Sequence, residues 1–150
     1  MIEFGHLSHV GLRRELNEDT YYGDAELGLW LVADGMGGHD SGEVASALAR
    51  DAIVREVRAG KSLAEAILRA NEEIIRQSKR RNESMPMGTT VVAVRVASNH
   101  RFELAWVGDS RAYLWNGKLQ QVSSDHSYVQ ELIDQGQLTP EQARSHPYRN

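Results

Sequence analysis

The spacing of apolar residues changes twice along this sequence of 150 residues, and these changes limit the folds it can adopt. Gly28–Asp34 is apolar at successive positions, as in a strand covered on both faces. From Ser41 to Val57, and again from Ser62 to Ile74, apolar residues recur every three to four positions, as on amphipathic helices. Strand-like patterns return from Gly88 onward. Clustered strands separated by clustered helices predict an α+β fold rather than alternating βαβ units.

The boundaries of the two helices carry clear sequence signals. Gly60 is typical of a helix end, and Ser62 with Glu65 three residues later forms a capping-box pattern. Asn116–Gly117 predicts a tight hairpin turn. The other predicted elements are a strand over Glu3–Gly11, an antiparallel meander of Gly88–Ser98, Arg101–Ser110 and Arg111–Ser123, and helices over Asp125–Gln135 and Thr139–Arg144.

Composition excludes several classes of function. With 41% hydrophobic and 25% charged residues, and without repeats or a linker, residues 1–150 are predicted to form a single globular domain. The formal charge of −4 gives no support to a nucleic-acid partner, and the basic run Lys79–Arg81 is expected to end a helix in solvent. No apolar run long enough to span a membrane and no secretory signal is visible. The lack of cysteine fits a cytoplasmic location and excludes a cysteine-nucleophile phosphatase.

Acidic residues stand beside turns at three separate places in the sequence. They are the pair Glu18–Asp19, Asp34 at the end of the apolar strand, and Asp109 after a later strand. Each alone is most simply a turn residue that bonds its own backbone. If the carboxylates converge, cations must neutralise them, and oxygen ligands of this kind select Mg²⁺ or Mn²⁺. Two such ions can activate a water molecule and bind a phosphoryl oxygen.

Two other kinds of site are tested by the same segments. The glycines at Gly35 and Gly37 lack the third glycine of a dinucleotide-binding loop, and no lysine precedes Lys61 to complete a P-loop. The "GDSRA" around Ser110 approaches a nucleophile elbow, and Asp134 and His146 follow in the order found in α/β-hydrolases. That motif needs a helix after the serine, whereas a hairpin is predicted there. It remains a minor alternative.

Five motifs resemble one family in order and spacing. They are "RxxxED" (Arg14, Glu18, Asp19), "DGMGGHxxGExAS" (Asp34–Ser46), "MGTT" (Met87–Thr90), "VGDSRAYL" (Val107–Leu114) and the tail from Asp125. The sequence resembles the bacterial branch of the metal-dependent serine/threonine protein phosphatases, the PPM or type 2C class. The resemblance implies a four-layer α/β/β/α sandwich of antiparallel sheets flanked by helix pairs, and hydrolysis of phosphoserine and phosphothreonine by a water that bridges two Mn²⁺ or Mg²⁺ ions.

The resemblance also implies metal ligands. Asp34 corresponds to the carboxylate that bridges the two catalytic ions. The carbonyl of Gly35, and Glu18 partly through water, complete the shell of the second ion. Asp109 matches the residue that holds a third ion in bacterial members.

Further roles follow for residues around the metals. Arg14 matches the arginine that binds the substrate phosphate, and Asp19 matches the acid that supports metal-bound waters. Met36 stands where animal members have a histidine that resembles a general acid, so the proton donor is unassigned, and His39 is a candidate for contact with the leaving group.

Family domains are longer than this sequence, and two further metal-binding aspartates have no counterpart in it. We therefore expect an N-terminal portion of a catalytic domain, incomplete at its C-terminus, with weak or no activity by itself and with open sheet edges that favour a dimer or strand exchange. The implied partners are phosphoserine and phosphothreonine proteins and a cognate kinase. The alternative is a pseudophosphatase or interaction module with the same fold and an incomplete metal site.

Overall fold

The computed structural model describes residues 1–126, 135–137 and 139–144. The chain divides into two compact units, Met1–Trp106 and Val107–Asn150. None of the helices in the described residues is long and apolar enough to cross a membrane.

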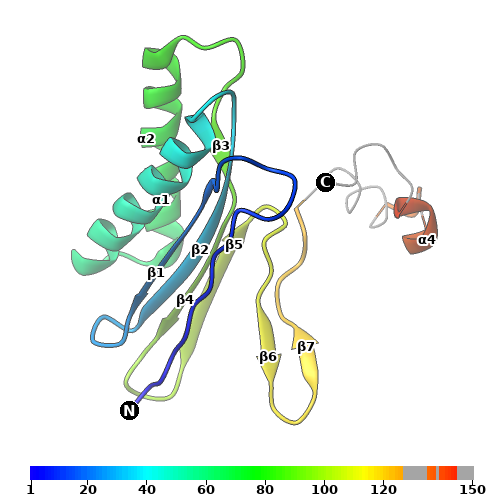
Figure 1. Cartoon of the computed structure of the whole chain (residues 1–150). Helices are drawn as coiled ribbons and strands as arrows, with labels where there is room; N and C mark the ends of the chain where they lie inside the picture. The colour runs from blue at the N-terminus through cyan, green and yellow to red at the C-terminus, as the bar shows by residue number, and fades with distance from the viewer. Residues whose placement is uncertain (127–134, 138, 145–150) are drawn as a thin grey trace. The chain divides into compact units, whose positions relative to one another are not determined.

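The first unit is built on a five-stranded sheet (Figure 1). Its strands lie in the order β1-β2-β4-β5, and the short β3 pairs with the end of β2. Antiparallel pairing joins β2 to β1, β3 and β4. The strands are β1 (Asp19–Asp24), β2 (Leu29–Met36), β3 (Gly88–Thr89), β4 (Val91–Val96) and β5 (Phe102–Val107).

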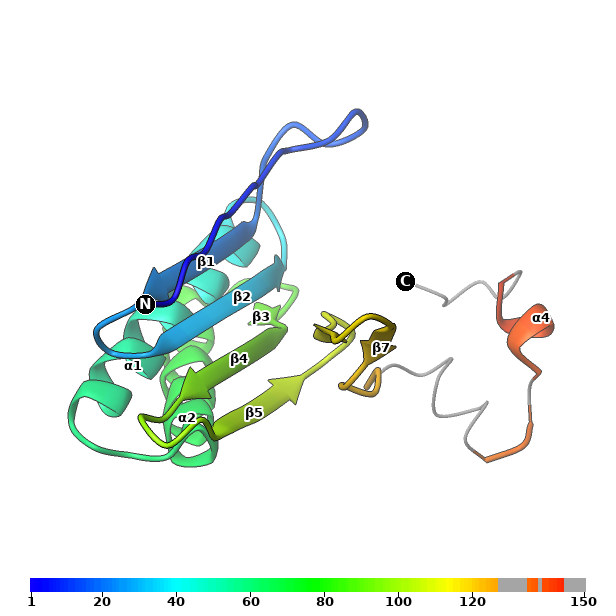
Figure 2. The ribbon, with the colours of Figure 1, turned by 90° about the horizontal axis from the view of Figure 1, so that it is seen from below.

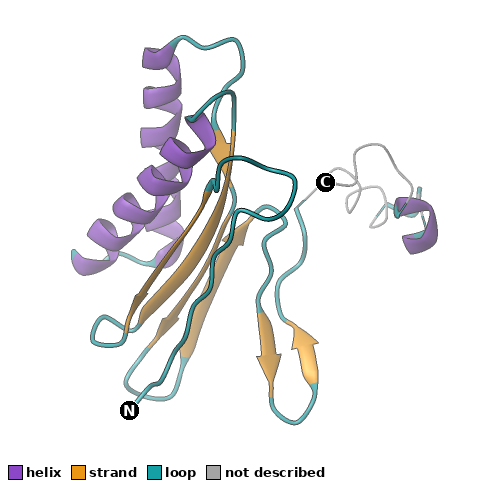
Figure 3. Ribbon diagram, in the orientation of Figure 1, coloured by secondary structure: helices purple, strands orange, loops and turns teal. Residues whose placement is uncertain are grey.

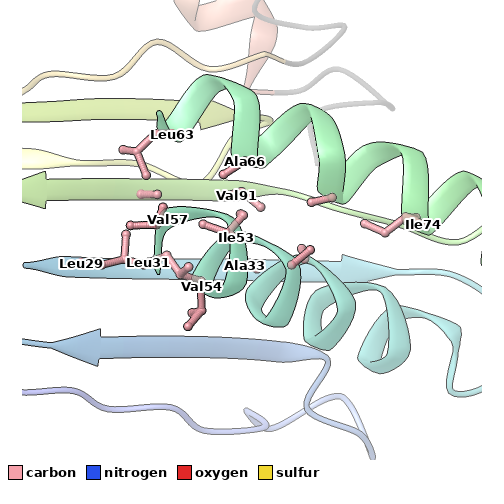
Figure 4. Packing of buried hydrophobic residues seen from close by; sticks show 14 of the residues in the cluster. Leu29, Leu31, Ala33, Ile53, Val54, Val57, Leu63, Ala66, Ile74 and Val91 are labelled. Atoms are coloured by element: carbon pink, nitrogen blue, oxygen red, sulfur yellow. The ribbon is translucent and has the colours of Figure 1, made fainter. Parts of the chain in front are cut away.

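Two helices, α1 (Ser41–Arg58) and α2 (Leu63–Arg81), cover one face of this sheet (Figure 2). The alternation along β2 explains why, because Leu29, Leu31 and Ala33 are buried while Val32 is exposed. Burial of each large apolar side chain in this layer contributes about 1.5–3 kcal/mol. The core between sheet and helices includes Leu29, Leu31, Ala33, Ile53, Val54, Val57, Leu63, Ala66, Ile74 and Val91 (Figure 4).

The helix boundaries confirm the sequence signals. The Ser62 hydroxyl accepts a hydrogen bond from the Glu65 N–H, and the Glu65 carboxylate accepts one from the Ser62 N–H, which completes the capping box. Gly60, which follows the C-cap residue Ala59 of α1, adopts a positive φ of 85°, where a side chain would be strained. At the far end of α2, Asn82 takes the left-handed conformation that stops a helix.

The second unit contains a hairpin (Figure 3). Strands β6 (Tyr113–Trp115) and β7 (Leu119–Gln121) pair across the predicted turn at Asn116–Gly117. The short helix α4 (Pro140–Ala143) begins after Thr139, whose hydroxyl caps it. Most of the helix predicted over Asp125–Gln135 lies outside the described residues.

Three strand predictions need correction. Glu3–Gly11 is not a strand. Its described contacts include two ring contacts, with Phe4 against Trp30 at 5.9 Å and His6 stacked on Tyr21 at 4.1 Å between ring centroids, and a hydrogen bond from the Asn17 side chain to the Ser8 hydroxyl. The strand that pairs with β2 in this region is β1, which sequence reasoning missed.

The predicted strand Gly88–Ser98 is interrupted at Thr90, between β3 and β4. The segment Arg111–Ser123 forms the hairpin predicted from the Asn116–Gly117 turn, but β6 and β7 make a separate two-stranded sheet and do not continue the predicted meander. Antiparallel strands segregated from a helix pair nevertheless confirm the α+β class.

Candidate metal and phosphate site

Two carboxylates meet at one end of the β1–β2 pair. The register places Asp19 directly opposite Asp34. Directly opposed residues in an antiparallel pair have Cβ atoms about 4.5–5.5 Å apart on the same face, and like charges there destabilise the sheet. Both residues are exposed on the face of the sheet opposite the helices. A cation at this position would relieve the repulsion.

The backbone of Asp34 is held by hydrogen bonds to Thr90, the residue between β3 and β4. Its N–H donates to the Thr90 hydroxyl at 3.0 Å, and its carbonyl accepts from the Thr90 N–H at 2.8 Å. The register is the same on both sides of Thr90, so Thr90 lies opposite Asp34, and its hydroxyl accepts the Asp34 N–H at the point where β3 and β4 are separated. Thr90 thus orients the peptide that carries the carboxylate.

Glu18 precedes β1 and is anchored through its backbone carbonyl. That oxygen accepts from the Gly35 N–H at 3.1 Å and from the hydroxyl of the buried Ser46, on α1, at 2.7 Å. Its carboxylate is only 12% exposed and lies against Gly42 in the first turn of α1. The helix end stabilises a negative charge at this position.

Close backbone approach makes this packing possible. A Cβ on Gly35 would overlap the carbonyl oxygen of Gly42, and a Cβ on Gly42 would overlap the Glu18 carboxylate. Glycine at both positions lets the end of β2 touch the first turn of α1. Within the "DGMGG…G" pattern, Gly35 and Gly42 therefore allow close packing around Glu18.

The remaining predicted residues of the first unit surround this region. The Arg14 guanidinium, whose side chain is 73% exposed, lies 3.6 Å from the Glu18 carboxylate. The Asp19 N–H donates to the Asn17 side chain at 3.1 Å, which shapes the chain before β1. His39 is exposed in the turn between β2 and α1, with a positive φ of 51°.

Asp109 belongs to the second unit, in the loop between β5 and β6, and is exposed. Arg111 and Asp125 form a bidentate pair across this loop, with a shortest contact of 2.7 Å. The Asp125 carboxylate raises the pKa of Arg111. Together with the bond from the His126 N–H to the Gly108 carbonyl at 2.8 Å, this pair closes the loop that carries Asp109.

The donors of the first unit fit a hard divalent cation in chemical type, because carboxylates and a backbone carbonyl are the ligands that Mg²⁺ and Mn²⁺ prefer. They are not collected into one shell, since the Glu18 carboxylate turns toward α1 while Asp19 and Asp34 face the other side. Within residues 1–126, 135–137 and 139–144, no group of three or more acidic, histidine or cysteine side chains stands together in a metal-binding arrangement.

Sequence reasoning missed the residues that support the site. Thr90 and Ser46 lie within the motifs "MGTT" and "GExAS", but the motifs alone indicate no role for them. Asn17 lies next to the acidic pair, and asparagine is a common turn former. It could therefore have been predicted to shape the chain before Asp19.

The serine-hydrolase alternative finds no support in the described residues. Ser110 is followed by strand β6 and not by a helix, so the required strand–turn–helix is missing. Asp134 and His146 lie outside the described residues.

Comparison with known proteins identifies the same family. A family model described as Protein phosphatase 2C matches residues 12–147. The serine/threonine protein phosphatase PstP of Mycobacterium tuberculosis is 40% identical over 157 residues, and the match covers 100% of this chain and 30% of PstP. Protein phosphatase PhpP of Streptococcus pneumoniae is 34% identical over 161 residues, covering 99% of this chain and 65% of PhpP.

Solved structures agree in fold. The crystal structure of the M. tuberculosis phosphatase PstP superposes with a TM-score of 0.83 at 41% identity, covering 95% of this chain and 63% of that one. The catalytic domain of PstP in complex with two manganese ions gives a TM-score of 0.80 at 40% identity, covering 91% and 61%.

The chain thus spans from about a third to about two thirds of the length of these curated relatives. The family match and the identity extend through both compact units. The chain belongs to the protein phosphatase 2C family of metal-dependent serine/threonine protein phosphatases.

Proposed function

We propose that this chain supplies the N-terminal part of a protein serine/threonine phosphatase that hydrolyses phosphoserine and phosphothreonine in a two-metal centre built on Asp34. The observation that carries the proposal is the direct opposition of Asp19 and Asp34, beside a Glu18 whose carbonyl is bonded to Gly35. Opposed carboxylates are maintained where a cation neutralises them. Activity of these residues by themselves is expected to be low.

In this proposal Asp34, Glu18 and the carbonyl of Gly35 hold two Mn²⁺ or Mg²⁺ ions, and Asp109 holds a third. When bound, the ions acidify a water molecule and neutralise charge that develops on the phosphoryl oxygens. Support comes from the donor types and from the relative PstP, solved with two manganese ions.

The protein side chains take three further roles. The exposed Arg14 guanidinium binds two oxygens of the substrate phosphate, for which its planar fork is suited. Asp19 accepts hydrogen bonds from waters around the ions. His39, in the exposed turn that follows β2, contacts the leaving group of the substrate.

We also propose that both compact units belong to one phosphatase domain with four layers. The sheet face opposite α1 and α2 exposes apolar side chains, among them Val32 at 46% and Phe102 at 56%. A second sheet packed on that face would bury them, as in a β-sandwich. The substrates are then phosphoserine and phosphothreonine proteins, with a kinase that phosphorylates the same residues.

Isothermal titration of the 150-residue chain with Mn²⁺ tests the metal site. The wild-type chain is expected to bind, and Asp34→Ala is expected to abolish binding because it removes the bridging carboxylate. Asp51→Ala is the matched control, since Asp51 is an exposed carboxylate on α1 that pairs with its neighbour Arg50. Loss of binding in the control as well would contradict a specific site.

Arg14 separates metal binding from phosphate binding. In a longer chain that completes the catalytic domain, Arg14→Ala should raise KM for a phosphoserine peptide by about tenfold or more, the effect of one lost charge-assisted contact, whereas Asp34→Ala should abolish turnover. The Mn²⁺ affinity of Arg14→Ala should be close to that of the wild type. Complete and equal loss of turnover in Arg14→Ala and Asp34→Ala would refute this division of roles.

The alternative is an interaction module that keeps the fold without a complete metal site. It is favoured by the finding that the described residues hold no ready group of three metal ligands. An absence of Mn²⁺ binding in the wild-type chain, together with an intact fold, would favour this alternative.

A further inference from the structure

Four side chains join the end of α2 to the start of α1. The Arg81 guanidinium contacts the Glu83 carboxylate at 3.0 Å and the Asp40 carboxylate at 2.5 Å. The Ser41 hydroxyl donates to the other oxygen of Glu83. We call Asp40, Ser41, Arg81 and Glu83 the helix clamp.

The clamp is anchored on a buried side chain, although Asp40 is 59% exposed. Ser41 is fully buried, so its hydroxyl depends on Glu83 as a partner. The side chains of Arg81 and Glu83 are only 25% and 27% exposed. The Ser41 hydroxyl lowers the pKa of Glu83, and the Glu83 carboxylate raises the pKa of Arg81.

The Asp40 side chain contacts Arg81 and does not cap its own helix. It occupies the N-cap position of α1, where an aspartate side chain normally accepts a hydrogen bond from the first turn, yet its side chain makes no such bond. Its carboxylate points to Arg81, which lies 41 residues later in the chain. The Asp40 side chain therefore ties the start of α1 to the end of α2.

The clamp adjoins the candidate metal site through the next residue. Gly42 follows Ser41 and lies against both the Glu18 carboxylate and the backbone of Gly35. Any displacement of the first turn of α1 would therefore displace the surface on which Glu18 rests. This chain of contacts leads from Arg81 and Glu83 to two of the proposed metal ligands.

We propose that Arg81 and Glu83 are positioning residues, which hold the first turn of α1 against Glu18 and Gly35 and thereby set the geometry in which these two groups meet a divalent cation. The part that concerns the cation rests on the proposed function. The part that concerns Glu18 and Gly35 can be measured in the metal-free chain.

A second ion pair provides a matched control. Arg55, in the last turn of α1, contacts Glu73 of α2 at 2.5 Å, so it also joins the two helices. It has no described contact with Glu18, Gly35 or Gly42. Arg55→Met removes a helix-to-helix ion pair of the same kind without touching the clamp.

The metal-free readout is amide hydrogen exchange of the wild-type chain, Arg81→Met, Glu83→Gln and Arg55→Met. The informative amides are Gly35, bonded to the Glu18 carbonyl, and Val44, bonded to the Asp40 carbonyl. Both are expected to exchange about tenfold faster in the clamp variants and at the wild-type rate in Arg55→Met. Arg55→Met should instead affect the Ala59 amide, which is bonded to the Arg55 carbonyl.

The second readout is Mn²⁺ affinity by calorimetry. The clamp variants should bind about tenfold more weakly, the usual cost of losing residues that orient metal ligands. Arg81→Lys, which keeps the charge but not the planar fork, should fall between wild type and Arg81→Met. Arg55→Met should bind like the wild type.

Unchanged exchange at Gly35 and Val44 in the clamp variants overturns the proposal, as does an equal loss of Mn²⁺ affinity in Arg55→Met. If the wild-type chain binds no Mn²⁺, the proposed function fails for this chain, and the exchange rates alone decide the inference. If Arg81→Met does not fold, Glu83→Gln supplies the same comparison, because it preserves the shape of the side chain and the Arg81–Asp40 pair.

Discussion

At the scale of single residues, two glycines determine how close the candidate site lies to the helix that supports it. Gly35 and Gly42 bring the backbone of β2 and the first turn of α1 into contact, and the Glu18 carboxylate lies directly beside Gly42. A methyl group at Gly42 would occupy the space of that carboxylate. The site is therefore sensitive to a residue that is not expected to bind metal.

Gly42→Ala should displace the Glu18 carboxylate and also press on the backbone of Gly35. We expect a loss of about 1–3 kcal/mol in the free energy of unfolding, the usual cost of overpacking, and weaker Mn²⁺ binding. Urea unfolding and calorimetry check the two effects. Gly38→Ala is the control, because a Cβ there would meet no atom within 4 Å; a similar loss in both variants would rule out the steric reason.

The opposed pair Asp19–Asp34 predicts a conflict between stability and metal binding. Asp19→Asn removes one of two like charges from the register pair. The metal-free variant should be more stable than wild type by less than about 1 kcal/mol, whereas its stabilisation by added Mn²⁺ should be smaller. Thermal unfolding in EDTA and in Mn²⁺ measures both, and a variant that is less stable in EDTA would contradict the repulsion.

At the scale of elements, the sequence predicts the helices better than the strands. Both α1 and α2 have long apolar stripes and local end signals, such as the Ser62–Glu65 capping box, so short-range information is sufficient. Strand β1 has the sequence "DTYYGD", with charges at both ends and a glycine, and it is a strand only because β2 pairs with it. The Glu3–Gly11 segment has the alternation of a strand but no described ladder partner.

The candidate site also has a part that could be predicted from the sequence and a part that could not. Glu18, Asp19 and Asp34 could be predicted because each acidic residue stands beside a turn in the sequence. The helix clamp could not, because Arg81 and Asp40 are far apart in the chain and Arg81 reads as the solvated end of a basic helix. The expectation that Lys79–Arg81 ends in solvent is thus wrong for Arg81, whose charge is paired twice.

The contribution of the clamp to stability should be lost in acid. Because Glu83 has a lowered pKa in the folded chain, the contribution is complete above the ordinary glutamate pKa of about 4.3 and disappears as the pH falls through the lowered value. Glu83→Gln should therefore be less stable than wild type at pH 7, and the two should converge below about pH 4.

Urea unfolding at several pH values between 7 and 3 measures this convergence. Glu72→Gln is the control, since Glu72 is an exposed carboxylate of α2 that pairs only with Arg69 among its described contacts. A difference between Glu83→Gln and wild type that is the same at pH 3 and pH 7 would show that the charge of Glu83 is unimportant.

At the scale of the whole chain, the first unit leaves one face and two edges of its sheet without a described partner strand. β1 and β5 are the outer strands, and Phe102 on β5 is 56% exposed. Open edges with apolar side chains promote pairing between chains. We expect the apparent mass of the 150-residue chain to rise with concentration in size-exclusion chromatography with light scattering.

Phe102→Lys should reduce this association, because a charge on an edge strand opposes pairing. Leu68→Lys is the control, since Leu68 is 65% exposed on the outer side of α2 and lies on no strand. A wild-type chain that stays monomeric at the highest concentration tested would show that these edges are protected.

The register of β1 on β2 has a consequence for parts of the molecule far from the carboxylates. The two strands are joined by the short turn Ala25–Gly28, which is held by bonds from the Glu26 and Leu27 N–H groups to the Asp24 carboxylate at 2.9 and 3.1 Å. Because side chains alternate between the faces of a strand, slipping this pairing by one residue would move Asp19 away from Asp34 and turn a carboxylate toward the apolar core. The number of residues in this turn, at the opposite end of the hairpin, therefore determines that the two acids lie opposite each other at the candidate site, although their charges repel.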